Sequence, residues 1–174
     1  MAKLKDLIDI FLQPGEYFVA DADYQMRTML GSCVSITLWH PATRIGAMSH
    51  FLLPERSQAM LELAALDPRY GDEALALMLA ELARAGIRAS DCQGKIFGGG
   101  NMFPSHSRRG AAHVGRKNGE AARALLRDHG VPIVSESLFG TGHRQIIFNV
   151  SNGDVWSHQV HLTAHEAQAE GFLL

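Results

Sequence analysis

The sequence GSCVSITLWHPATRIGAMSHF, residues 31–51, has the pattern of a β-hairpin. Apolar side chains take the even positions of 34–38 and polar side chains take the odd ones, which is the period of two that a strand requires. The tetrapeptide HPAT at 40–43 places proline second in a turn, and extended character resumes over 44–51. We therefore expect two antiparallel strands joined by a short turn.

The register of this hairpin decides whether a cysteine and a histidine meet. If His40 and Thr43 pair across the turn, Cys33 lies opposite His50 with Cβ atoms about 4.5–5.5 Å apart. Their face is the more polar one, so we expect the other face in the core and the thiol to be accessible as a nucleophile. A single bulge would shift this register. The alternative is a core thiol beside an unrelated histidine, because free cysteine is often buried.

Outside the hairpin, strands and helices mix without regular alternation. The patterns predict a short amphipathic helix over 3–12, a strand from Tyr17, a helix within 70–86, a strand at 95–97, a helix over 119–130 capped by Asn118, a strand over 131–136 and a hairpin over 144–160 turning at Asn152-Gly153. Residues 103–113 are expected to be exposed and mobile. This order favours a mixed α+β layered fold, and the length of 174 residues favours a single domain over 1–174.

Composition excludes several classes of protein. The chain is 47% hydrophobic and 20% charged, which is typical of a folded domain, and its formal charge of −2 gives no basic surplus for nucleic acid. Asp6 and Asp9 interrupt the apolar N-terminal stretch, so no signal peptide is expected, and no run approaches the roughly 20 apolar residues of a membrane span. We expect a cytoplasmic protein without membrane insertion, in which Cys33 and Cys92 are reduced thiols.

Five segments carry a family resemblance. They are TMLGSCVSITLW at 28–39, GAMSHFLLPE at 46–55, KIFGGGNMF at 95–103, VGRKN at 114–118 and HRQIIFNVSNGDV at 143–155. In this order they resemble the motifs of the CheD family, the bacterial chemoreceptor glutamine deamidases, although Gly100 stands where that family commonly has alanine. The resemblance implies a layered α/β/β/α sandwich of the cysteine-hydrolase toxin type. It also implies two partners, the cytoplasmic helices of methyl-accepting chemotaxis receptors and a CheC-type phosphatase.

The resemblance assigns catalytic positions to Cys33 and His50, and Thr28 best matches the third. A glutamine amide is a poor leaving group, so its hydrolysis needs a nucleophile, an acid for the departing ammonia and stabilisation of an oxyanion. Cys33 would form a thioester, His50 would move the protons, and Thr28 would orient the imidazole. No cofactor or metal is required. The backbone N–H of Cys33 and a neighbour in the Gly31-Ser32 turn are expected to form the oxyanion hole. Gly98, Gly99 and Asn101 are expected to shape the site. An ordinary strand-entry turn is the alternative for Gly31-Ser32.

Other functions remain open to the sequence. A binding module that keeps Cys33 and His50 without turnover is the main rival, and the same thiolate could hydrolyse receptor methyl esters. His158, His161 and His165 would form a metal site only on one helix, so a solvated edge is preferred. Arg108-Arg109, with His106 and His113, could dock an acidic receptor helix. Cys92 is interpreted as an incidental, half-buried thiol.

Overall fold

The computed structural model describes residues 6–57, 65–104 and 111–161. Its elements are β1 (Ile8–Phe11), β2 (Tyr17–Ala20), β3 (Tyr24–Leu30), β4 (Val34–His40), β5 (Ile45–Ser49), α1 (Gly71–Arg84), the 3-10 helix η2 (Ala89–Asp91), β6 (Gln93–Gly98), α2 (Ala111–Asp128), β7 (Ile133–Leu138), β8 (His143–Asn149) and β9 (Val155–Val160). The strands form a four-stranded sheet, β1-β3-β8-β9, and a five-stranded sheet, β2-β5-β4-β6-β7. The predicted α+β class is confirmed.

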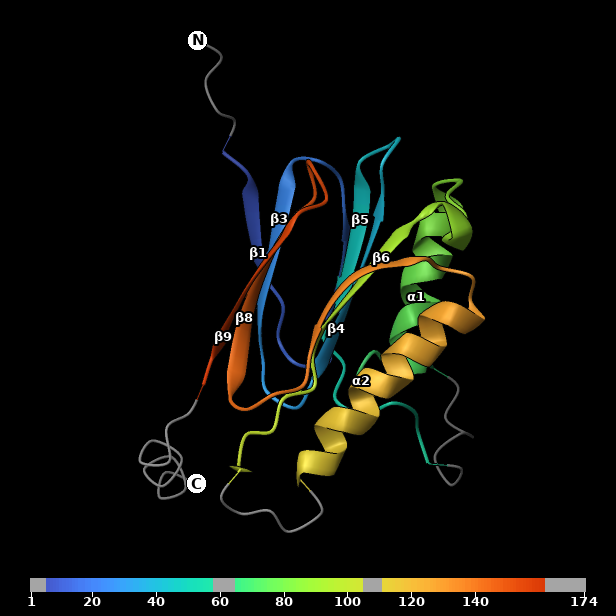
Figure 1. Cartoon of the computed structure of the whole chain (residues 1–174). Coiled ribbons are helices and arrows are strands. Elements are labelled where there is room, and N and C mark those ends of the chain that lie inside the picture. Colours follow the sequence, from blue (N-terminus) through green and yellow to red (C-terminus); the bar gives the residue numbers. More distant parts are fainter. Residues whose placement is uncertain (1–5, 58–64, 105–110, 162–174) are drawn as a thin grey trace.

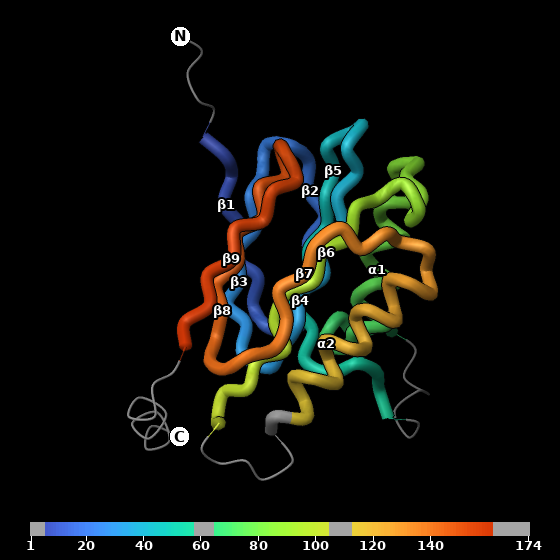
Figure 2. The backbone as a smooth tube through the Cα atoms, in the orientation of Figure 1, coloured from blue at the N-terminus to red at the C-terminus, as the bar shows by residue number. Residues whose placement is uncertain are grey.

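The layers are stacked as sheet, sheet and helix. Figure 1 shows α1 and α2 together on one side of the five-stranded sheet, with the four-stranded sheet on the other, and Figure 2 shows the same arrangement as a tube. The described residues thus form three of the four expected layers. On the open face of the four-stranded sheet, Phe11, Met29 and Trp156 are exposed. Neither α1 nor α2 is long and apolar enough to cross a membrane.

Two apolar clusters hold the layers together. The even positions of β4 pack with Phe51 and with Leu75 and Met78 of α1. The opposite face of the five-stranded sheet meets the other sheet, where Met48 packs with a cluster that includes Phe148. The prediction of one accessible face on the hairpin is therefore wrong. Both faces are covered because helices lie on one side and a second sheet lies on the other.

The hairpin exists as predicted, but its register differs by two residues. His40 pairs with Ile45 and Trp39 with Gly46, so Cys33 does not lie opposite His50. The physical reason is the turn, in which the left-handed φ of 53° at Arg44 lengthens the loop to four residues. A shift of two keeps the parity of every side chain. Cys33 and His50 therefore still share one face of the sheet.

One predicted helix is a strand, and the predicted start of another helix is wrong. The described part of 3–12 forms β1, which pairs in parallel with β3, because Ile8, Ile10 and Leu12 also repeat every two residues and a short helix is marginal without packing. α2 begins at Ala111 rather than after Asn118, so Asn118 is not its cap. The predicted helix within 70–86 and the strand at 95–97 are confirmed as α1 and β6.

The last third of the chain follows the prediction closely. The strand over 131–136 is found as β7, and the final hairpin as β8 and β9, joined by a turn in which Gly153 has a φ of 81°. Two strand pairs are parallel: β1 with β3, and β6 with β7, which α2 connects. Most of the predicted 103–113 loop lies outside the described residues, and its end belongs to α2.

Candidate active site

Thr28 and His50 come from different sheets and form a hydrogen bond between them. Thr28 lies on β3, His50 follows β5, and the Thr28 Oγ1 to His50 Nδ1 distance is 2.7 Å. Thr28 Oγ1 also lies 2.8 Å from the carbonyl oxygen of Leu12, which can only accept. The hydroxyl of Thr28 therefore donates its hydrogen bond to the Leu12 carbonyl, and its oxygen accepts a hydrogen bond from Nδ1–H of His50. This assigns the tautomer in which Nε2 of His50 carries a free lone pair.

Cys33 lies on the same inter-sheet side as His50, immediately before β4. Val34 pairs with Phe51 through two backbone hydrogen bonds, which makes Cys33 and His50 diagonal neighbours across that pair. Diagonal neighbours are about 7–8 Å apart, within reach of long or aromatic side chains. The described residues show no hydrogen bond between the Cys33 thiol and His50. Catalytic hydrogen bonds are often long in the free enzyme and shorten with substrate.

Burial keeps both groups neutral. Desolvation lowers the pKa of His50 from 6.5 to about 4, partly opposed by the charge of Glu16. Desolvation also raises the pKa of the Cys33 thiol, partly opposed by a hydrogen bond from its own backbone N–H. At neutral pH the pair is therefore thiol and imidazole rather than thiolate and imidazolium. An imidazole with a free lone pair beside a thiol is suited to act as a general base.

The buried neutral state of His50 predicts a pH-dependent loss of stability. Its folded pKa lies below that of the unfolded chain, so protons bind the unfolded state more tightly. The free energy of unfolding should fall by about 3 kcal/mol as the pH drops from 6.5 to 4. Urea unfolding of the parent and of His50→Gln at several pH values measures this. Parallel pH profiles for the two proteins would contradict it.

The glycine segment after β6 packs directly against the Cys33 backbone. Gly99 N–H donates to the Cys33 carbonyl at 2.9 Å, and Gly100 N–H donates to the Gly31 carbonyl at 2.9 Å. Gly98 has a φ of 114°, and a Cβ there would lie 2.2 Å from the Cys33 carbonyl oxygen. Only glycine fits at this position. The predicted grouping of Gly31, Gly98 and Gly99 around Cys33 is thus what the structure shows, although their catalytic role stays a prediction.

The remaining predicted site residues differ in what they contact. The N–H of Cys33 donates to no other described residue, which leaves it available to an oxyanion. The carbonyl of Ser32 accepts a hydrogen bond from Asn118. The backbone of Asn101 bonds to Gly140 and Gly142, and its side-chain Oδ1 accepts from Phe103 N–H. Within the described residues its side chain forms no hydrogen bond with Cys33. Asn101 therefore shapes the loop that carries the glycines.

Comparisons with known proteins show the family of the chain. A family model described as CheD chemotactic sensory transduction matches residues 52–159. A protein of Albidiferax ferrireducens called "Probable chemoreceptor glutamine deamidase CheD 2" is 69% identical over 174 residues, and the alignment spans 100% of both chains. The chain belongs to the CheD family. A protein of Dechloromonas aromatica called "Probable chemoreceptor glutamine deamidase CheD 3" is 42% identical over 151 residues, 87% of each chain.

The CheD family model begins two residues after His50, whereas the match to the Albidiferax relative includes the segments of Thr28, Cys33 and His50. Among solved structures, the hypothetical protein YfiH of Bacillus licheniformis is similar with a TM-score of 0.45 and 15% identity, over 75% of this chain and 60% of that one. The family resemblance predicted from the motifs is confirmed.

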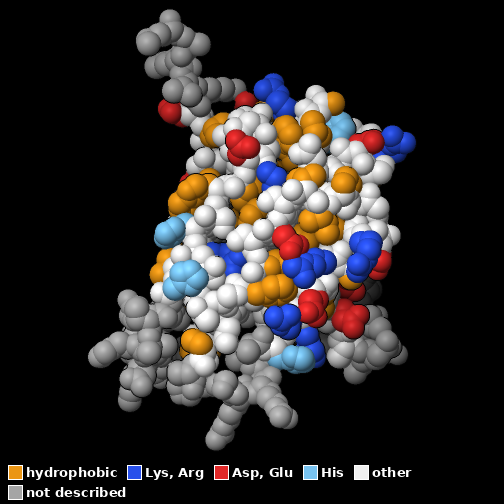
Figure 3. Space-filling model, in the orientation of Figure 1, with side chains coloured by type: hydrophobic (Ala, Val, Ile, Leu, Met, Phe, Trp, Pro, Cys, Tyr) orange, Lys and Arg blue, Asp and Glu red, His pale blue; other side chains and the backbone are white. Residues whose placement is uncertain are grey.

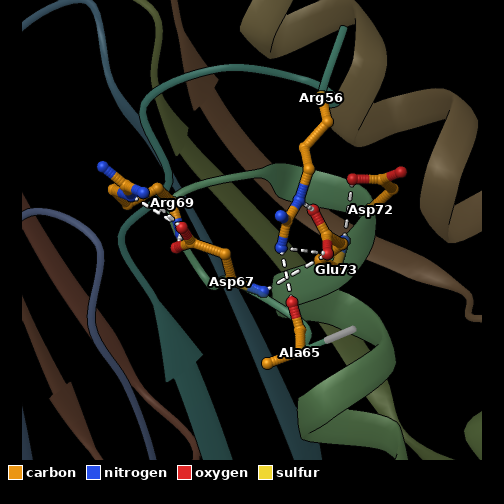
Figure 4. Close-up of polar contacts among 6 residues, drawn as sticks. All are labelled: Arg56, Ala65, Asp67, Arg69, Asp72 and Glu73. Atoms are coloured by element: carbon orange, nitrogen blue, oxygen red, sulfur yellow. Dashed lines mark hydrogen bonds and ion pairs between the residues drawn. The ribbon is translucent and has the colours of Figure 1, made fainter. Parts of the chain in front are cut away.

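In this member of the CheD family, an ion-pair cluster anchors the segment that follows His50. Arg56 donates to both carboxylate oxygens of Glu73 and to the carbonyl of Ala65, as Figure 4 shows. Leu52 N–H donates to the Arg69 carbonyl, and Asp67 pairs with Arg69 nearby. The chain after Phe51 is therefore bonded to the segment before α1 instead of continuing along β4.

The sequence did not point to three residues beside the site. Asn118 bonds the chain on both sides of the Cys33 and His50 pair. The buried Arg144 donates to the carbonyls of Ser137 and Phe139, and Phe139 N–H in turn donates to Gly98. Phe139 has a φ of 68° and is covered by Arg116 and Arg123. The VGRKN and HRQ motifs contained Asn118 and Arg144, but only the fold shows what they touch.

The other candidates of the sequence have little connection with the site. Cys92 is fully buried rather than half-buried, and desolvation raises the pKa of its thiol to about 11. His158 is exposed on β9, and the described residues contain no cluster that could hold a metal; His165, His106 and Arg108-Arg109 lie outside them. Figure 3 shows basic and acidic side chains intermixed on the helical side, where Arg123 pairs with Glu136.

Proposed function

We propose that this chain is a protein-glutamine deamidase that converts glutamine side chains of methyl-accepting chemotaxis receptors to glutamate during chemotactic adaptation. Family membership supports the activity, and two relatives carry the name of chemoreceptor glutamine deamidase. The observation that carries the proposal in the structure is the Thr28 to His50 hydrogen bond. It fixes a neutral imidazole, with its basic nitrogen free, on the face that holds Cys33.

The first half of the reaction forms a thioester. Nε2 of His50 removes the thiol proton as the Cys33 sulfur attacks the carbonyl carbon of the glutamine amide. The Cys33 N–H stabilises the oxyanion of the tetrahedral intermediate. The imidazolium then gives its proton to the amide nitrogen, the carbon–nitrogen bond breaks and ammonia leaves. Thr28 accepts a hydrogen bond from Nδ1–H of His50 throughout the reaction and so holds the ring in one tautomer.

The second half of the reaction releases glutamate. His50, again neutral, removes a proton from a water molecule that attacks the thioester carbonyl. The carbon–sulfur bond then breaks, and the thiolate takes the proton back from His50. Since the pKa of the thiol is raised and that of the imidazole is lowered, both groups return to their neutral forms. The net change is one amide and one water converted to one carboxylic acid and ammonia.

Mass spectrometry of a receptor cytoplasmic fragment tests this function. Incubation with the purified chain should increase the mass of glutamine-containing peptides by about 1 Da, because –NH2 is replaced by –OH in acyl transfer to water. A His50→Gln chain is the control for spontaneous deamidation. Retained binding with no mass change in the parent would instead support the non-catalytic binding module.

Three finer expectations belong to the same proposal. We place the activity in the cytoplasm, where the receptor helices would be accessible, and we treat residues 1–174 as one domain. The family resemblance further suggests a CheC-type phosphatase as a partner. Co-elution of the purified chain with such a phosphatase in size-exclusion chromatography checks the last expectation, and separate elution at micromolar concentrations argues against it.

A further inference from the structure

Asn118 lies on α2, outside the predicted catalytic group, and is completely buried. Its side-chain Nδ2 donates to the carbonyl of Ser32 at 3.0 Å and to the carbonyl of Leu52 at 2.8 Å. Ser32 immediately precedes Cys33, and Leu52 is the second residue after His50. One amide group therefore joins the two chain segments that carry the proposed nucleophile and base.

The bonds of Asn118 lie where the β4 and β5 strands separate. Beyond the Val34 and Phe51 pair, an antiparallel ladder would next join Ser32 to Leu53 through backbone hydrogen bonds. Leu53 N–H instead donates to the Arg69 carbonyl, so it is not available to Ser32. The Asn118 amide takes the place of that donor. It closes a gap in the sheet beside Cys33.

The position of α2 makes this contact possible. A Cβ on Gly115 would lie 2.6 Å from the Gly99 carbonyl oxygen, and a Cβ on Gly119 would lie 2.5 Å from the Phe139 ring. The two glycines let the helix approach the loop around Cys33 closely. Asn118 stands between them in sequence and therefore reaches both carbonyls with a short side chain.

Only the amino half of the amide makes these bonds. Oδ1 of Asn118 is buried and has no hydrogen-bond partner in the described residues. Asparagine therefore acts here as a double donor, and both acceptors are carbonyl oxygens that cannot donate. Aspartate has nearly the same shape but only accepts hydrogen bonds when ionised. It would place a negative charge against the two carbonyls.

We propose that Asn118 is a positioning residue that sets the separation of Cys33 from His50. The proposal rests on the proposed deamidase function for its catalytic consequence, but the positioning itself is a property of the free chain. Among the described residues, the Val34 and Phe51 pair is the last backbone contact between these two strands. Asn118 holds it at the point where the thiol must approach the imidazole, and a misplacement of about 1 Å can cost about 10²-fold in rate.

Two measurements on Asn118→Asp and Asn118→Ala test the proposal. Hydrogen exchange followed by mass spectrometry should show at least about tenfold faster exchange in peptides covering 31–36 and 50–53, and little change in peptides of β8 and β9. Deamidation should show kcat lowered about 10²-fold with KM nearly unchanged. The alanine variant loses the same donors without adding charge, so it decides the matter if the aspartate variant fails to fold.

Asn149→Asp is the matched control. Asn149 uses Oδ1 to accept from Ser151, a role that aspartate can keep, and it lies at the far end of β8. This variant should leave both measurements unchanged. Exchange that is unaltered, or faster uniformly along the chain, or kcat that is retained in both Asn118 variants, would overturn the proposal. If the parent itself produces no mass change on the receptor fragment, the deamidase function fails, and hydrogen exchange alone decides the positioning role.

Discussion

Replacing Cys33 with serine is expected to lower kcat for glutamine deamidation by at least about 10³-fold, because the attacking atom is lost. Serine keeps the shape of the side chain but has a far less acidic proton. The base available to remove that proton is weak, since burial lowers the pKa of His50 to about 4. This base can still remove the proton of a thiol, even one whose pKa is raised, but not the much less acidic proton of a hydroxyl. Deamidation measured by mass spectrometry, together with urea unfolding, checks this result.

Cys92→Ala is the matched control for the loss of a thiol. Cys92 is buried in the cluster between α1 and the five-stranded sheet, and its sulfur donates a hydrogen bond to the Arg88 carbonyl. Its removal should change the unfolding midpoint and leave kcat of the folded protein near the parent value. A Cys33→Ser chain with more than a tenth of the parent rate would exclude Cys33 as the nucleophile. An inactive Cys92→Ala chain that is folded would show that the loss of rate is not specific to the Cys33 thiol.

The second large effect is expected for Thr28→Val, with kcat lowered about 10²-fold and KM little changed. Valine has the shape of threonine, but it cannot accept a hydrogen bond from Nδ1–H of His50 or donate one to the Leu12 carbonyl. The imidazole loses the contact that fixes its tautomer and orientation. The unpaired carbonyl and ring nitrogen should also lower the free energy of unfolding by about 1–3 kcal/mol. Steady-state kinetics and urea unfolding on the same preparation separate the two effects.

Thr28→Ser and Thr37→Val are the two controls for the Thr28→Val variant. Serine restores the hydroxyl and should recover most of the rate. Thr37 lies on the inter-sheet face of β4, is equally buried, and forms no recorded side-chain hydrogen bond with the described residues. Its valine variant should therefore keep its kcat. Equal losses at Thr28 and Thr37 would mean that the rate depends on packing of the interior and not on the contact with His50.

Local patterns predicted most elements because their periods are short. The alternation over β4, the apolar face of α1 and the Asn152-Gly153 turn each depend on neighbours in sequence, and all three are found. The register of the first hairpin depended on the conformation of Arg44, and no neighbouring residue type marks a left-handed arginine. The helix expected over 3–12 failed because β3, a partner remote in sequence, offers β1 a ladder.

The sequence placed the proposed catalytic residues close together but did not reveal their environment. The motifs and the parity of the hairpin placed Cys33 and His50 on one face, and this survives a register shift of two. That this face is enclosed by a second sheet could not be read from the hairpin, so the lowered pKa of His50 was not foreseen. Asn118 looked like a helix cap because asparagine is favoured there, and its bonds to Ser32 and Leu52 exist only in the assembled fold.

Thr28, whose hydroxyl orients the imidazole, belongs to one sheet, whereas His50 and Cys33 belong to the other. Full activity therefore requires that the two sheets are packed together. A nascent or loosened chain can contain every strand and still be inert, because its two halves have not yet closed on each other. An imidazole that is oriented only in the finished protein would thus leave the Cys33 thiol slow to react with bystander proteins during synthesis.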